Sequence, residues 1–183
     1  MGLRAGADRR SAQPGRDPGR TPLSATCPGC GLLLETADGP AHPYIGASPA
    51  CWALYGSALA RAYSDPACRT VLQLAVDAYA CQHPGVPGRQ SAQSVAIHLM
   101  TLCLVLEDGA DPREGPKSHR RMVARPEFAW LDPPSERGQV TVADVLDADS
   151  AAAYVDTVWA WARDTWQAWA PHHSTVRAWL SAG

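Results

Sequence analysis

The stretch from Ser91 to Leu106 constrains this chain more than any other, because it has to be buried. Its sequence, S-A-Q-S-V-A-I-H-L-M-T-L-C-L-V-L, has no charged residue over sixteen positions. Read as a helix, it is apolar around most of its circumference, which is typical of a central helix covered on all sides. It therefore predicts an all-α domain, bundle-like, in which other helices pack around this one.

Capping residues and apolar periodicity place the other helices around it. Ser48 and Asp65 each precede a proline, the usual order of an N-cap and a first helical position. Pro84 and Gly85 end the second of these helices. Four to five helices are predicted, at about 48–63, 65–83, 91–107, 149–169 and 172–180.

Composition divides the chain into a tail and one domain. Residues 1–24 hold five arginines among Gly, Pro and Ser and almost nothing apolar, so a disordered tail is expected. Residues 25–183 are expected to form one helical domain. Its parts are a zinc-knuckle-like segment (25–50), three helices (48–108), a loop-rich insertion (109–147) and C-terminal helices (148–181).

The insertion carries only weak patterns. A small strand pair is expected at 128–131 and 139–142, and Thr141-x-x-Asp144 predicts a helix start. The basic cluster at 119–125 is surrounded by acidic residues and is interpreted as a solvated loop.

Charge and hydropathy exclude some functions. The net charge is −2, which gives neither a nucleic-acid footprint nor attraction to membranes. There is no run of 18 apolar residues, and the first residues have neither the apolar segment of a secretory signal nor a myristoylation pattern. A cytoplasmic protein is expected, whose partner is an unknown small molecule or protein.

The most specific motif is Cys27-Pro-Gly-Cys30-Gly31. Two thiolates separated by two residues can bind one tetrahedral ion, and the glycines permit the tight turn, as in a zinc knuckle. A thiol-redox pair is the alternative, but it requires a helix that starts at the first cysteine. An incidental pair is a third interpretation.

A knuckle supplies only half of a metal site. Cys51 is the predicted third ligand, since it lies near a helix N-terminus, which favours a thiolate. The fourth is His83, with His42 as the alternative. The remaining cysteines lie among small apolar residues and are predicted to be core residues: Cys68, Cys81 and Cys103.

A line of small polar residues runs along the central helix: Ser91, Ser94, His98 and Thr101. Buried polar groups need partners, and the sequence offers Asp77, Gln82 and His83 before the helix and His172 and His173 after it. Asp77, His98, His172 and His173 are predicted to line a second pocket that suits zinc or another divalent metal such as iron or manganese. The alternatives are a core role for His98, a capping or surface role for the histidine pair, and an orienting role for Asp77.

Several phrases together resemble a bacterial family of uncharacterised proteins, a domain of unknown function. They are C-P-G-C-G, D-A-Y-A-C-Q-H-P-G, S-V-A-I-H-L and H-H-S-T-V-R-A-W, and the resemblance runs from about Thr26 to Trp179. A further phrase is Y-I-G-A-S-P-A-C-W-A-L-Y. The resemblance implies that eight of the candidate residues sit in the family's recurrent phrases: Cys27, Cys30, Cys51, Asp77, His83, His98, His172 and His173. It implies no reaction.

Two main functions therefore remain open. One is a zinc-binding helical protein with a structural cysteine site and a role in binding or regulation. The other is a metal-dependent enzyme, hydrolase- or transferase-like, that uses the His/Asp pocket. A thiol-redox protein is a weaker alternative, and no serine elbow, phosphate loop or dinucleotide fingerprint is present.

Overall fold

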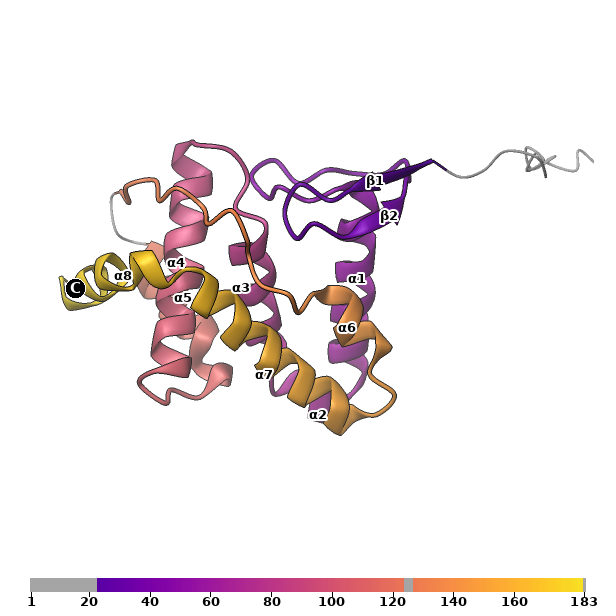
Figure 1. Cartoon of the computed structure of the whole chain (residues 1–183). Helices are drawn as coiled ribbons and strands as arrows, with labels where there is room; N and C mark the ends of the chain where they lie inside the picture. The colour runs from indigo at the N-terminus through magenta and orange to yellow at the C-terminus, as the bar shows by residue number, and fades with distance from the viewer. Residues whose placement is uncertain (1–22, 124–126, 183) are drawn as a thin grey trace, which may run out of the picture.

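The computed structural model describes residues 23–123 and 127–182, and in this part of the chain the regular secondary structure is helical apart from one short hairpin (Figure 1). The predicted all-α class is confirmed. The expected disordered tail falls outside the described residues up to position 22, and Ser24 already belongs to the first strand. The elements in order are β1 (Ser24–Thr26), β2 (Leu33–Glu35), α1 (Pro49–Ser64), α2 (Pro66–Arg69), α3 (Leu72–Gln82), α4 (Arg89–Leu106), η1 (Pro112–Glu114), α5 (Gly115–Val123), α6 (Val142–Asp147), α7 (Ala151–Ala168), η2 (Ala170–His172) and α8 (His173–Ser181).

The N-terminal hairpin presents the knuckle. β1 and β2 pair antiparallel, with Ser24 opposite Glu35, so the turn between them carries the two cysteines. Gly31 has a φ of 79°, a conformation that favours glycine, and its N–H donates to the Cys27 carbonyl at 3.0 Å. The hairpin lies across the N-terminal end of α1 (Figure 1).

Helix starts follow the predicted caps. The Ser48 hydroxyl accepts from the Cys51 N–H, and the Asp65 carboxylate accepts from the Ala67 N–H. The predicted second helix is in fact broken into α2 and α3 at Thr70 and Val71, with α2 only one turn long. The break lets α2 pack on α7 while α3 packs on both α4 and α7.

The long helix α4 is buried along most of its length, as predicted for a central element. Ala96, Leu99, Met100 and Leu102 are fully buried. Helices α3, α5, α7 and α8 all contact it. It fixes the position of every side chain that projects from its surface toward these neighbours.

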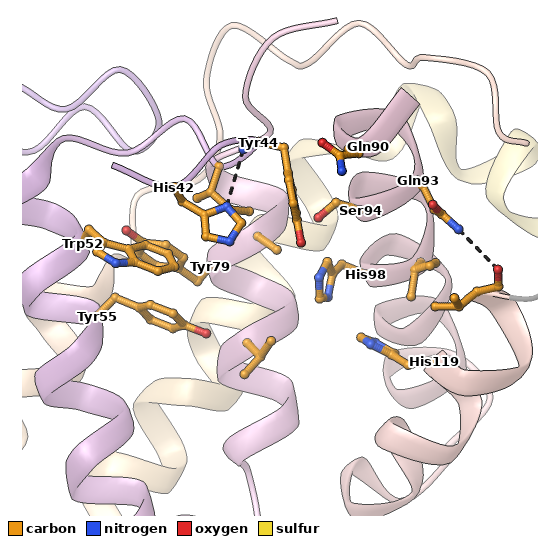
Figure 2. Close-up of a pocket in the computed structure, with 15 residues that line it drawn as sticks. His42, Tyr44, Trp52, Tyr55, Tyr79, Gln90, Gln93, Ser94, His98 and His119 are labelled. Carbon is orange, nitrogen blue, oxygen red and sulfur yellow. Dashed lines mark hydrogen bonds between the residues drawn. The ribbon is translucent and has the colours of Figure 1, made fainter. Parts of the chain in front are cut away.

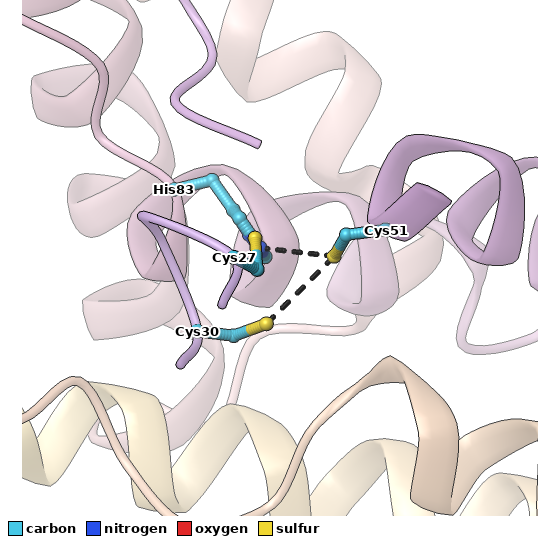
Figure 3. Close-up of side chains that lie close together, drawn as sticks. All are labelled: Cys27, Cys30, Cys51 and His83. Carbon is cyan, nitrogen blue, oxygen red and sulfur yellow. Dashed lines mark hydrogen bonds between the residues drawn. The ribbon is translucent and has the colours of Figure 1, made fainter. Parts of the chain in front are cut away.

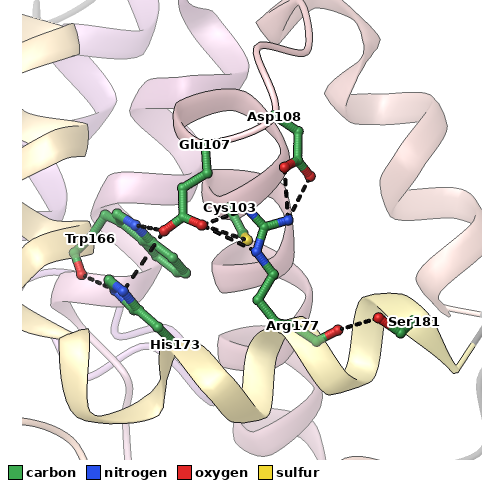
Figure 4. Close-up of polar contacts among 7 residues, drawn as sticks. All are labelled: Cys103, Glu107, Asp108, Trp166, His173, Arg177 and Ser181. Carbon is green, nitrogen blue, oxygen red and sulfur yellow. Dashed lines mark hydrogen bonds and ion pairs between the residues drawn. The ribbon is translucent and has the colours of Figure 1, made fainter.

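The C-terminal helices α7 and α8 pack against α4, and their polar contacts gather just after its last residue (Figure 4). Arg177 on α8 donates to Glu107 at 3.1 Å and to Asp108 at 2.8 Å, just past the end of α4. Trp166 on α7 donates its indole N–H to the same Glu107 at 2.9 Å. One carboxylate therefore ties α4, α7 and α8 together.

The loop-rich insertion differs from its prediction in two ways. The expected strand pair at 128–131 and 139–142 is absent from the described residues: 128–131 and 139–141 are irregular, and Val142 already belongs to α6. Part of the insertion, expected to be a solvated loop, forms α5, which packs against α3 and α4. The capping box of Thr141 and Asp144 is confirmed and starts α6.

Among the described residues, none of the helices is both long enough and apolar enough to cross a membrane.

Candidate metal centres

Three cysteines and one histidine converge at the junction of the hairpin, α1 and α3 (Figure 3). Their ligand atoms, the Sγ of Cys27, Cys30 and Cys51 and one ring nitrogen of His83, all lie within 4.8 Å of one another. Cys30 is half-buried and the other three are buried. The knuckle supplies two ligands, the first turn of α1 the third and the end of α3 the fourth.

The spacing of these atoms fits a single tetrahedral ion. Two sulfurs that each lie about 2.3 Å from such an ion are about 3.8 Å apart. The Sγ atoms of Cys30 and Cys51 are 3.7 Å apart. Cys51 Sγ and His83 Nε2 are 3.3 Å apart, close to the roughly 3.5 Å expected for a sulfur and a nitrogen on one ion. The cluster could hold a metal.

A backbone contact sets which His83 nitrogen faces the cluster. His83 Nδ1 lies 2.8 Å from the Tyr79 carbonyl, which can only accept a hydrogen bond. Nδ1 therefore carries the proton, and Nε2 points its lone pair toward Cys51. Metal-binding histidines are commonly oriented in this way.

The pKa values of the three thiols diverge because the thiols hydrogen-bond to one another. Bonds from Cys30 and then Cys51 lower the pKa of Cys27 far below its ordinary range. The bond to Cys27 raises the pKa of Cys30 to about 11, and that of Cys51 rises mainly through its own bond to Cys27. Without a metal, ionisation of Cys27 is favoured and ionisation of the other two thiols is costly. A divalent cation would stabilise all three as thiolates.

Two neighbours support the knuckle. A side chain at Gly29 would overlap the His83 ring, so only glycine allows this close approach. The Arg137 guanidinium donates to the carbonyls of Pro28 and Gly29, both at 2.7 Å. Its positive charge beside the cluster offsets part of the negative charge of three thiolates.

A second group lies between α3, α4 and α5 and consists of Asp77, His98 and His119. Asp77 is fully buried. Its Oδ1 lies 2.7 Å from His98 Nδ1, 3.0 Å from His119 Nε2 and 2.9 Å from the Gln73 amide nitrogen. The two imidazole rings meet edge to face at 4.8 Å between centroids. This group too could hold a metal.

A pocket of about 400 Å³ opens beside the second group (Figure 2). One wall is aromatic and comes from the 42–55 segment and α3, with Tyr44, Trp52, Tyr55 and Tyr79. The facing wall is polar and comes from α4 and α5, with Gln90, Gln93, Ser94, His98 and His119. The pocket is therefore an aromatic slot with imidazoles at one side.

Residues 25–170 match the family of unknown function DUF5946. The chain belongs to this family. No curated protein and no solved structure matches it significantly. Membership of DUF5946 confirms the resemblance drawn from the sequence phrases, and it brings no reaction with it.

Of the two candidates for the fourth ligand, His83 lies in the cysteine cluster of this DUF5946 chain and His42 does not. His42 packs its ring against Tyr44 and Trp52, with centroids 4.4 and 5.1 Å away, and lines the pocket. Cys68, Cys81 and Cys103 are buried in the core, as predicted. Cys27 lies in a turn after β1 and does not start a helix, unlike a thioredoxin-type pair.

The prediction that His172 and His173 close the second pocket is wrong. His173 stacks on Trp166 at 3.7 Å between centroids, and its Nδ1 lies 3.8 Å from Glu107 (Figure 4). His172 Nε2 lies 2.8 Å from the Asp132 carbonyl. Both hold the start of α8 in place, because the turn at Pro171 aims them at α7 and the preceding loop.

Thr101 of the polar line and Gln82, one of its expected partners, also have structural roles. The Gln82 amide donates to the carbonyls of Arg137 and Val140 and accepts from the Trp161 indole, so it is fully satisfied. The Thr101 hydroxyl donates to the Ile97 carbonyl within α4. Only Ser94 and His98 of this line face the pocket.

His119 takes the place that the histidine pair was expected to fill, and the sequence analysis missed it. It lies in the basic cluster interpreted as a loop. The available signal was Met122, three residues later, which pairs with His119 on one face of a short amphipathic helix and is buried.

Proposed function

We propose that this chain is a zinc-binding helical protein, in which a structural zinc ion held by Cys27, Cys30, Cys51 and His83 supports a pocket for a small molecule or protein partner. The observation that carries this proposal is the convergence of three thiols and one oriented imidazole nitrogen within 4.8 Å. We place the protein in a reducing compartment such as the cytoplasm, where such thiols stay free to bind metal.

Zinc is favoured by the ligand set. Three thiolates and one imidazole form a soft, tetrahedral environment of the kind found in structural zinc sites. Calcium and magnesium prefer oxygen ligands and would not be retained here. With four protein ligands the site is closed, which suits a structural ion better than a catalytic one.

The ligands come from three separate parts of the chain, the hairpin, α1 and the end of α3. The hairpin is short, and a two-stranded hairpin alone is marginally stable in water. Zinc would join it to α1 and α3, and α3 also forms part of the pocket wall. Metal binding would thus contribute folding free energy directly.

Thermal unfolding with and without metal tests the proposal. Zinc-loaded protein is expected to melt cooperatively at a higher temperature than protein stripped with a strong chelator, and added zinc should restore the difference. Cys27→Ser should behave like stripped protein, whereas Cys68→Ser, at a buried cysteine outside the cluster, should still respond to zinc. Stripped wild-type protein that melts at the same temperature as loaded protein would refute the structural role.

A further inference from the structure

We propose that Asp77, His98 and His119 form a second metal site, open to the pocket, which binds a divalent transition metal and leaves coordination positions for a small ligand. This inference goes beyond the structural zinc and does not depend on it, because the two centres share no ligand.

The ligand set is the first argument. One carboxylate and two imidazoles from α3, α4 and α5 place their atoms within 4.8 Å of one another. Two histidines and one carboxylate are the protein ligands of many open zinc and iron sites, where remaining positions hold water or substrate. Unlike the cysteine cluster, this set does not complete a tetrahedron.

The environment of the carboxylate is the second argument. Asp77 is fully buried, and its Oδ2 has no hydrogen-bond partner among the described residues, although Oδ1 has three nitrogen neighbours. A buried carboxylate is costly unless its charge is compensated. A cation beside Asp77 would supply that compensation.

The position of His119 is the third argument. Its Nε2 lies 3.0 Å from Asp77 Oδ1 and 3.4 Å from the Gln73 amide nitrogen, which can only donate. The 3.0 Å separation places His119 Nε2 and Asp77 Oδ1 where one ion could bind both, because ligand atoms about 2.1 Å from an ion can lie about 3.0–3.4 Å apart.

The pocket lining indicates that a ligand could reach the second metal site and which class of ligand would fit there. His98 and His119 lie in its wall, with side chains 15% and 19% exposed, so a metal there could be reached by a ligand. Among the described residues that line this pocket, none is Lys or Arg, which disfavours phosphates and other strongly anionic ligands. The opposite wall is aromatic, with Tyr55 and Tyr79 stacked at 3.8 Å.

These walls fit a small, planar, uncharged molecule with an oxygen that can coordinate a metal. Its ring would lie along the aromatic wall, and Gln90, Gln93 and Ser94 would hydrogen-bond its edge. A metal there would act on the bound oxygen as a Lewis acid.

Cobalt(II) substitution distinguishes the two centres, because thiolate ligands give an intense charge-transfer band that nitrogen and oxygen ligands do not. Wild-type protein is expected to bind two cobalt ions, one with that band and one with ligand-field bands only. His119→Ala should lose the second ion and keep the charge-transfer band. His42→Ala removes a pocket histidine outside the group and should bind both ions.

The outcomes separate this proposal from the structural zinc. Wild-type protein that binds one cobalt ion and shows ligand-field bands without the charge-transfer band would contradict the structural cysteine site but support the second site. Wild-type protein that binds a single cobalt ion with that band, or His119→Ala that still binds two, would overturn the second site. Asp77→Asn keeps the shape of the side chain and removes its charge. The affinity of the second site for cobalt should therefore fall by about tenfold or more.

The open position has its own probe. Benzohydroxamate carries a planar ring and two oxygen donors, and it should shift the ligand-field bands of the second cobalt ion without changing the charge-transfer band. A second cobalt ion whose bands do not respond to benzohydroxamate would overturn the open position.

Discussion

Gly29 lies directly against the ring of His83, so the turn of the knuckle and the imidazole share one small space. In Gly29→Ala the new methyl group must push the ring or the turn aside. We expect the affinity for zinc to fall by about tenfold or more, the range seen when residues that orient a ligand are changed. Competition with a chromophoric chelator measures this affinity.

Gly56→Ala is the matched control. Gly56 is exposed in the middle of α1, with open space where a side chain would go. The substitution should leave zinc affinity unchanged and raise the free energy of unfolding by roughly 0.5–1 kcal/mol, as expected for glycine replaced by alanine within a helix. Equal zinc affinity in the two variants would show that the contact between Gly29 and His83 is unimportant.

Ionisation of Glu107 makes the free energy of unfolding depend on pH in the acid range. Burial raises the pKa of its carboxyl, but hydrogen bonds from Arg177 and Trp166 outweigh burial and set that pKa below its ordinary value. Its stabilising contribution is therefore present above the unfolded-state pKa of about 4.3 and is lost as the pH falls through the lower folded value.

Glu107→Gln tests that contribution. Between about pH 5 and about pH 3 the wild-type melting temperature should fall further than that of the variant, because only the wild type loses the ionised carboxylate. Acid also releases zinc, but that loss is common to both proteins and cancels in the comparison. Parallel curves would contradict the role given to Glu107.

Single residues also show what the sequence could and could not predict about the centres. The cysteine pair was visible from its spacing and Cys51 from its place near a helix N-terminus, whereas the sequence left the fourth ligand open between His83 and His42. His119 was not, because its role depends on a helix with few apolar residues. His172 and His173 were misplaced because spacing along the chain does not fix where a turn after a proline aims its side chains.

At the scale of elements, zinc is expected to join the hairpin, α1 and α3. Chelation should increase amide hydrogen exchange first between residues 24 and 48 and at the start of α1, where few other contacts oppose opening. Exchange in the middle of α4 should change least. Hydrogen exchange measured by mass spectrometry, with and without chelator, checks this order. Chelation that changes exchange nowhere, or by the same amount along the whole chain, would contradict it.

The elements themselves were predictable where caps and periodicity agree. The start of α1 and the box at Thr141 followed from local hydrogen bonds, which sequence specifies directly. The break between α2 and α3 did not, because it is imposed by packing on α7 and α4. α5 was missed since its stability comes from α3 and α4 and not from its own apolar content.

At the scale of the whole molecule, α4 carries the core. Leu99 is fully buried at its centre, so Leu99→Ala should lower the free energy of unfolding by roughly 2–5 kcal/mol through lost burial and the cavity left behind. Leu33→Ala, at a side chain that is 69% exposed, should change it by less than about 0.5 kcal/mol. Urea unfolding in zinc-saturated buffer compares the two, and similar losses would contradict a core centred on α4.

Tyr79 connects the cysteine cluster to the pocket. Its ring stacks on His83 at 4.0 Å and on Tyr55 at 3.8 Å, and its hydroxyl lies 3.6 Å from Cys51 Sγ. The structural centre and the aromatic wall of the pocket therefore rest on one side chain. A firmly held zinc ion would keep that wall in place.

Zinc content per chain tests most directly whether the cysteine cluster holds a zinc ion. It should be measured by elemental analysis of protein purified under reducing conditions, for the wild type, Cys51→Ser and His42→Ala. We expect Cys51→Ser to contain one zinc ion fewer than the wild type and His42→Ala to contain the same number. A folded wild-type protein without zinc, in which Cys27, Cys30 and Cys51 all react with a thiol reagent, would contradict it.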